Sequence, residues 1–245
     1  MKDVFTTRLT QLFTTGLLAF GLAFTMQVKA NDFSQLTIMT ENFPPFNYKQ
    51  DGKAAGSAVE LLTQASAAVG KPITNDKINV MTWARAYKAV QSGPNALLFS
   101  MTRTESREDL FKWAGPIGEN RVVIWTKKSS GIAPFDNIKD NSETVSVVRD
   151  TVGDQLMMTA GAVDGDLKRT SKPEAAAKML INDRVKLWAY SENSGAQQLE
   201  LAGANIDDYE IVHVLKASQL YFAFSKDVDD SVIQLLQKGI DQARK

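Results

Sequence analysis

Residues 95–107 read NALLFSMTRTESR, and this stretch contains both a central strand and one side of a candidate binding site. The apolar run that begins at Ala96 ends at Ser100, a second hydroxyl follows at Thr102, and Thr104 to Arg107 open a helical segment. A buried strand brings such hydroxyls to its carboxyl end, beside a guanidinium whose planar fork of donors matches a carboxylate. The stretch therefore predicts a clamp for a small anionic ligand, formed by Ser100, Thr102 and Arg107.

Helical and strand patterns alternate on both sides of this stretch. The expected strands are 36–40, 78–81, 96–100, 143–148, 166–170, 185–190 and 209–215, and the expected helices are 57–69, 83–91, 152–160, 171–182 (with Ser171 as N-cap) and 192–202. Such a succession predicts an α/β fold in which mostly parallel sheets are covered by helices.

Two extended segments, 121–126 and 219–224, bracket the second α/β unit. They predict a chain that leaves a first lobe and returns to it through a two-strand hinge, with a helix at 228–243 packed on that lobe. We expect residues 31–121 and 216–245 in the first lobe, and residues 122–215, hinge strands included, in the second.

The first 30 residues have the pattern of a secretory signal peptide. Lys2 and Arg8 precede an apolar core, and the segment ends at the small residue Ala30. A membrane anchor is the alternative, but the apolar core is marginal against the roughly 20 residues that a spanning helix needs. We expect cleavage after Ala30 and a mature protein in the periplasm.

The composition excludes several classes of function. The chain has 28 basic and 28 acidic residues, so nothing favours nucleic acid or an anionic membrane as a partner. It has no cysteine and one histidine, His213, which excludes disulfides, thiol chemistry and the usual zinc ligand sets. We expect a monomer without metal or cofactor.

Three blocks of sequence carry a resemblance to a known family. They are Leu36 to Phe46 (LTIMTENFPPF) followed by Asp51-Gly52 and Gly56 to Leu61, then Ser100 to Arg107 leading into Phe111 to Pro116, and finally Asp183 to Lys186. Over nearly the whole chain from Leu36, the sequence resembles the periplasmic solute-binding proteins of family 3, the polar amino acid type that serves ABC importers. Trp83-Ala-Arg-Ala86 is similar to one subgroup. The resemblance implies a two-lobed binding-protein fold.

The resemblance also implies roles for individual residues in the first lobe. Arg107 would grip the ligand carboxylate beside Ser100 and Thr102, and Phe43 and Trp83 would hold the ligand side chain between aromatic faces. Arg85 either reaches a second anionic group or is simply exposed.

The second lobe departs from the family pattern. Asp150 and Thr151 stand where a Gly-Thr turn is usual, and Ser191, preceded by Tyr190, stands where an aspartate binds the ligand ammonium. Ser191 accepts a hydrogen bond but supplies no counter-charge. Either Glu192 or Asp150 takes over that role, or the ligand is not a standard α-amino acid.

The leading hypothesis is a non-enzymatic binding protein that closes on a small carboxylated ligand, an amino acid or related metabolite, for an ABC permease. One alternative is a dehydratase-like enzyme of the same fold, with Glu192, Asp150 or Glu41 as proton donor. The other is a ligand-sensing partner of a membrane receptor.

Overall fold

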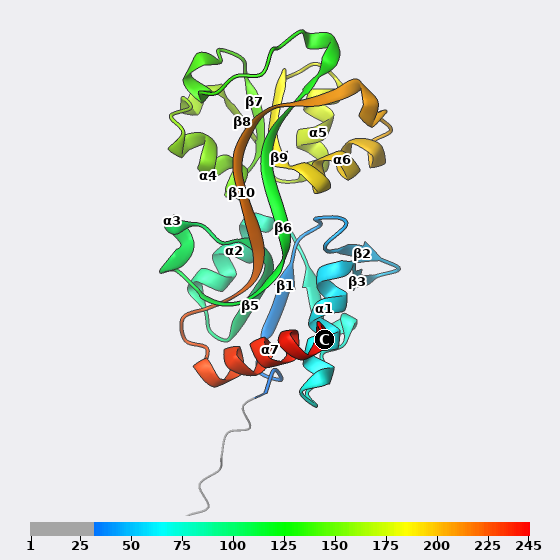
Figure 1. The fold of residues 1–245 in the computed structure, drawn as a ribbon, viewed down its shortest axis with the longest axis vertical. Helices are drawn as coiled ribbons and strands as arrows, with labels where there is room; N and C mark the ends of the chain where they lie inside the picture. Colours follow the sequence, from blue (N-terminus) through cyan, green and yellow to red (C-terminus); the bar gives the residue numbers. More distant parts are fainter. Residues whose placement is uncertain (1–31) are drawn as a thin grey trace, which may run out of the picture. The chain divides into compact units, whose positions relative to one another are not determined.

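The structure, a computed structural model, describes residues 32–245, and the predicted signal peptide at residues 1–30 lies outside them. Within this range eight strands form one sheet in the order β4, β1, β5, β10, β6, β9, β7, β8, and β2 and β3 form a separate hairpin. Figure 1 shows two groups of elements joined by the long strands β6 and β10. We call the group around β1, β4 and β5 the first lobe and the group around β7, β8 and β9 the second lobe.

The first lobe is a parallel three-stranded layer, in which β1 lies between β4 and β5, with helices packed on it. Its elements are β1 (Thr37–Thr40), β2 (Tyr48–Gln50), β3 (Lys53–Ala55), α1 (Ser57–Ala68), β4 (Ile78–Val80), α2 (Trp83–Ser92), β5 (Ala96–Thr102), α3 (Glu105–Glu108) and α7 (Asp230–Ala243). Helices α1 and α7 pack so closely that a Cβ on Gly239 would lie only 2.1 Å from the Ala65 carbonyl oxygen. Glycine is therefore required at this position.

The second lobe repeats this arrangement, with β7 parallel to both β8 and β9. Its elements are β7 (Val145–Val148), α4 (Val152–Thr159), β8 (Leu167–Thr170), α5 (Pro173–Ile181), β9 (Leu187–Ser191) and α6 (Glu192–Leu201). The predicted fold class is thereby confirmed. The predicted start of α5 is wrong: Lys172 is its N-cap and Pro173 its first residue, because the fixed φ of proline suits the first helical turn.

Two antiparallel strands, β6 (Lys112–Lys127) and β10 (Tyr209–Phe224), run through both lobes. The sequence pattern predicts two separate strands within β10, whereas the structure has one. Residues 213–219 include no buried side chain, so this part of the strand lacks the apolar alternation by which strands are recognised. The predicted lobe boundaries, at residues 121/122 and 215/216, fall within β6 and β10 and stay predictions.

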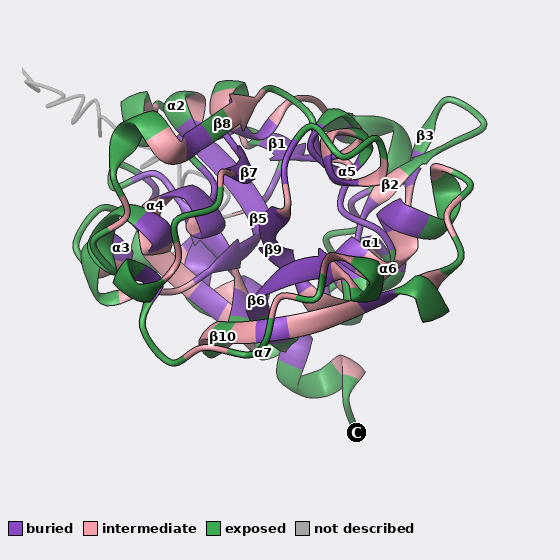
Figure 2. Ribbon diagram, turned by 90° about the horizontal axis from the view of Figure 1, so that it is seen from above, coloured by how far each residue is buried: buried purple, intermediate pink, exposed green. Residues whose placement is uncertain are grey.

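Buried strands form a rigid base for the residues at their ends. Every residue of β5, β7 and β9 is buried, and Figure 2 shows these strands in purple, with exposed surface on the outer helices. Burying a large apolar side chain such as Phe99 or Trp188 stabilises the fold by roughly 1.5–3 kcal/mol. His213 stacks on Phe135 and its Nδ1 lies 2.7 Å from the Phe135 carbonyl oxygen, which is a structural contact in the second lobe.

Candidate functional site

A cavity of about 20 Å³ lies where the carboxyl ends of β1, β5 and β9 meet the N-terminus of α4. It is lined by Glu41, Phe43, Trp83, Ser100, Thr102, Arg107, Asn120, Thr151, Val152, Gly153, Tyr190 and Ser191. Ligands of open α/β sheets bind outside the carboxyl ends of the strands, so this position is the expected one. The volume suits about one water molecule, and a larger solute therefore enters only when the lobes separate.

Most residues predicted for the site line this cavity, but two do not. Arg85 is exposed on α2, because it follows Trp83 by two residues and so lies on a different face of the helix. The Asp150 side chain is also exposed, and this residue takes part through its main chain. Conversely, the sequence prediction missed Asn120, Val152 and Gly153, whose residue types carry no signal for a binding site on their own.

A bulge in β5 explains how Ser100 reaches the cavity. The pairing of β10 with β5 shifts register where Phe222 faces Phe99 and Tyr221 faces Met101, which leaves Ser100 as the extra residue. Ser100 has a φ of 59°, an uncommon value for a residue other than glycine. Bulges re-aim side chains next to functional sites. The Ser100 hydroxyl is buried there and has no hydrogen-bond partner among the described residues.

Arg107 is buried, with an exposed fraction of 1%. Its Nε donates to Gln155 Oε1 at 3.0 Å, its Nη1 to the Thr102 carbonyl at 3.2 Å and its Nη2 to the Asp150 carbonyl at 3.4 Å. The guanidinium also lies over the ring of Trp83, 5.3 Å from its centroid. Burial lowers the pKa of Arg107 to about 10, and the nearby Tyr87 and Glu41 oppose this. The side chain thus stays cationic at neutral pH.

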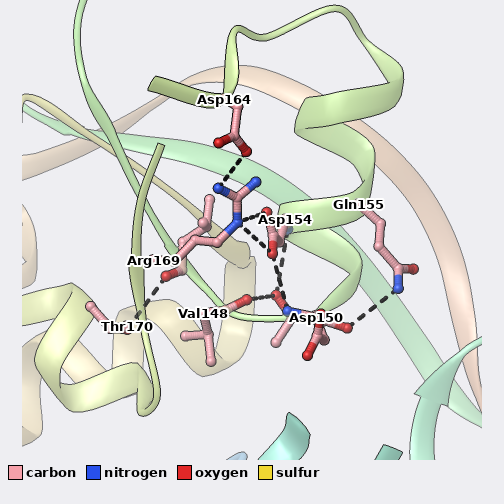
Figure 3. Close-up of polar contacts among 9 residues, drawn as sticks. Val148, Asp150, Asp154, Gln155, Asp164, Arg169 and Thr170 are labelled. Carbon is pink, nitrogen blue, oxygen red and sulfur yellow. Dashed lines mark hydrogen bonds and ion pairs between the residues drawn. The ribbon is translucent and has the colours of Figure 1, made fainter. Parts of the chain in front are cut away.

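The main chain of Asp150 links the two lobes. Its carbonyl oxygen accepts the Trp83 indole N–H at 2.7 Å as well as the Arg107 bond. Figure 3 shows how this turn is held: the Asp150 N–H donates to Asp154, whose two carboxylate oxygens also share the Arg169 Nε–H at 2.9 and 3.1 Å. Asp150 has a φ of 60°, a conformation that aspartate tolerates better than most residues. Asp150 can therefore stand in place of the glycine that the family resemblance leads us to expect, and the turn is kept.

The N-terminus of α4 faces the cavity through Thr151, Val152 and Gly153. The Thr151 hydroxyl caps the helix weakly, accepting from the Asp154 N–H at 3.5 Å. Unpaired N–H groups and the helix dipole at such an end favour negative charge. Together with Arg107 across the cavity, this end of the site suits a carboxylate.

Gly153 is predicted to tolerate no side chain. A Cβ at this position would lie 2.8 Å from the Ala189 carbonyl oxygen, so Gly153→Ala should push α4 away from β9. We expect a loss of roughly 1–3 kcal/mol in the free energy of unfolding, as for other overpacked sites, measured by urea denaturation. Gly165→Ala is the control, because nothing lies within 4 Å of its Cβ. Equal stability of the two variants would contradict this packing.

Asn120 connects the lobes at the hinge. Its Nδ2 donates to the Thr102 hydroxyl at 3.2 Å, and its Oδ1 accepts from the Ser191 hydroxyl at 2.6 Å. Ser191 is therefore engaged with a neutral amide and supplies no charge to the cavity.

The acidic group nearest to Arg107 in the cavity belongs to Glu41, which directly follows β1. Burial raises the pKa of the Glu41 carboxyl to about 8, although Arg107 lowers it and Glu174 raises it further. Glu192, a residue predicted to compensate for Ser191, instead pairs with Arg121 at 2.7 Å and does not line the cavity. Among the alternatives for the missing counter-charge, Glu192 stays a prediction, and in this structure a partner on β6 holds its carboxylate outside the cavity lining.

The sequence profile of the bacterial extracellular solute-binding proteins, family 3, matches residues 36–245. The chain belongs to this family. Its members bind solutes outside the cytoplasm, which confirms the resemblance seen in the sequence. Among curated proteins, none matches the chain.

Solved structures of several two-lobed binding proteins share the fold of this family 3 protein. A histidine kinase sensor domain similar to periplasmic binding proteins is 19% identical, with a TM-score of 0.73 over 85% of this chain and 90% of that one. The arginine-, lysine-, histidine-binding protein ArtJ from Geobacillus stearothermophilus is 18% identical, with a TM-score of 0.71 over 85% and 91%. An ABC uptake transporter substrate-binding protein from Streptococcus pneumoniae with bound histidine is 18% identical, with a TM-score of 0.72 over 86% and 87%.

A metal site and a membrane-spanning helix are not found in the described part of this family 3 protein. Residues 32–245 contain no group of three metal-ligating side chains. None of the helices in that range has the length and apolar character to cross a membrane.

Proposed function

We propose that the protein is a periplasmic binding protein that closes its two lobes on a small polar solute with a carboxylate, an amino acid or a related metabolite, for delivery to an ABC permease. The observation that carries this proposal is the position of Arg107. Its buried side chain lines the cavity together with the N-terminus of α4 and with Ser100, whose hydroxyl has no hydrogen-bond partner among the described residues. A guanidinium has five N–H donors, more than its three hydrogen bonds to Gln155, Thr102 and Asp150 use.

Closure follows from the contacts between the lobes. Hydrogen bonds from Trp83 and Arg107 to the Asp150 carbonyl join the lobes in the closed form. A solute that bridges Arg107 and the α4 N-terminus adds binding energy in the closed form only, so it shifts the population toward closure.

A thermal-shift screen of the exported protein against amino acids, keto acids, dicarboxylates and polyamines tests this function. A carboxylated ligand at a hundred times its dissociation constant should add about 2.7 kcal/mol of apparent stability. Isothermal titration calorimetry of each hit then gives its affinity. Stabilisation by polyamines alone would contradict the proposal, since Arg107 offers them no anionic partner.

A second candidate, a ligand-sensing partner of a membrane receptor, is favoured by the similarity to the histidine kinase sensor domain. Both functions use the same closed form. Co-purification of the ligand-bound protein with a permease supports delivery, whereas co-purification with a receptor supports sensing. An enzymatic use of Glu41 as proton donor would appear as turnover of a hit during calorimetry.

A further inference from the structure

The proposed function accounts for the ligand carboxylate but not for a ligand ammonium group. Ser191 stands at the position that usually holds the ammonium, and it carries no charge. Near the cavity the structure contains two acidic side chains, one from each lobe. Glu41 follows β1 in the first lobe, and Glu174 lies in the first turn of α5 in the second. Both line a second cavity of about 250 Å³, which shares Glu41 and Trp83 with the first.

Glu41 is available to a ligand. It is 6% exposed, and no hydrogen bond joins its carboxylate to another residue in the range 32–245. Its main chain is fixed, because the buried Asn47 side chain donates to the Glu41 carbonyl at 2.7 Å. The carboxylate therefore lies at a fixed place between the two cavities with free acceptor capacity.

Glu174 offers a second acceptor from across the cleft. Its Oε1 accepts from the Asn42 side chain at 2.7 Å, a hydrogen bond between the lobes, while its Oε2 is buried and has no partner among the described residues. The Tyr190 hydroxyl, which lines the first cavity, is likewise buried and unpartnered. Burial raises the pKa of the Tyr190 hydroxyl, Glu41 and Glu174 raise it further, and Ser194 opposes them.

None of the ion pairs in residues 32–245 includes Glu41 or Glu174, and Lys172, at the edge of the second cavity, is exposed. Arg107 interacts with Glu41 electrostatically but donates its hydrogen bonds elsewhere. Two carboxylates brought together by closure repel each other unless a positive charge or a proton joins them.

We propose that Glu41 and Glu174, one from each lobe, together bind a cationic group of the ligand, with Tyr190 beside them, in place of the aspartate that Ser191 replaces. This inference rests on the proposed function and deepens it: the ligand carries a carboxylate and a cationic nitrogen group. The second cavity, with walls that include Val80, Met81 and Pro173, has room for the rest of the molecule.

Matched pairs of compounds test the inference. They pair L-glutamate, L-histidine, L-arginine and L-lysine each with its 2-hydroxy analogue, which lacks only the α-ammonium group. Within the pair that binds, the member with the additional cationic group should bind the wild-type protein at least tenfold more tightly by calorimetry. Glu41→Gln should remove most of this preference, and Glu174→Gln should reduce it.

The control variant is Glu192→Gln, whose carboxylate pairs with Arg121 outside the cavity and which should keep the preference. A thermal melt of each variant shows that it is folded. Equal binding of the compound that lacks the cationic group would overturn the cation site at Glu41 and Glu174. If Arg107→Ala then abolishes the binding of that compound, the carboxylate site at Arg107 still stands. An unchanged preference in Glu41→Gln would overturn the cation site as well.

Discussion

Arg107→Ala is expected to abolish detectable ligand binding while leaving the protein folded. The substitution removes the donors aimed at the ligand carboxylate, and truncating one partner of a buried charge pair costs about 2–5 kcal/mol, a loss of roughly 30-fold to several thousand-fold in affinity. Isothermal titration calorimetry with a hit from the screen measures this loss directly. Arg107→Lys should bind with intermediate affinity, because an ammonium keeps the charge but lacks the planar fork of donors.

Arg103→Ala is the matched control for this experiment. Arg103 lies four residues earlier, pairs with Glu108 and lies over the rings of Trp113 and Tyr221, and it does not line the cavity. We expect this variant to bind as the wild-type protein does. Wild-type affinity in Arg107→Ala would contradict the clamp, whereas equal losses in both variants would indicate a general effect of the substitutions on this segment.

Glu41→Gln is expected to make the ligand-free protein more stable at pH 8 than the wild-type protein. The folded-state pKa of Glu41 is about 8, against an ordinary value of 4.5. Between these values the unfolded chain has released a proton that the folded protein still holds, so stability falls as the pH rises. Each pH unit within this window costs about 1.4 kcal/mol, and the loss levels off above pH 8.

Thermal melts at pH 5 and pH 8 measure this effect. From pH 5 to pH 8 the wild-type protein should lose on the order of 3 kcal/mol relative to Glu41→Gln, which corresponds to a difference in melting temperature of roughly 10 °C for a protein of this size. Glu60→Gln is the control, because Glu60 is exposed on α1. Parallel pH profiles for the wild-type protein and Glu41→Gln would show that Glu41 titrates normally.

The fold was largely predictable from the sequence, because the local pattern and the packing agree. In the α/β units, apolar residues recur at helical or strand spacing, so most element types were right and the boundaries were close. The exception is β10, whose middle part between the lobes has no buried face and therefore no periodicity. The start of α5 was misplaced because Ser171, a good capping residue, lies one position before the actual N-cap, Lys172.

The site was predictable only where one segment contains several of its residues. Ser100 and Thr102 lie on one strand and Arg107 lies in the short helix that follows it, so their spacing alone indicated a clamp. Glu41 and Glu174 are brought together by the topology of two lobes, and neither residue has a local pattern that points to the other. Asn120 lies on β6 among residues of an ordinary strand, and only its hydrogen bonds to Thr102 and Ser191 distinguish it.

The hydrogen bond from Trp83 to the Asp150 carbonyl gives the protein an intrinsic optical reporter. Trp83 is 3% exposed, and its indole N–H bonds to a residue of the opposite lobe. Separation of the lobes breaks this bond and brings water to the ring, which shifts indole fluorescence to longer wavelength. Trp113, Trp125 and Trp188 do not line the cavity, so we expect Trp83 to dominate the change in emission on closure, which a stopped-flow experiment can follow without any added label.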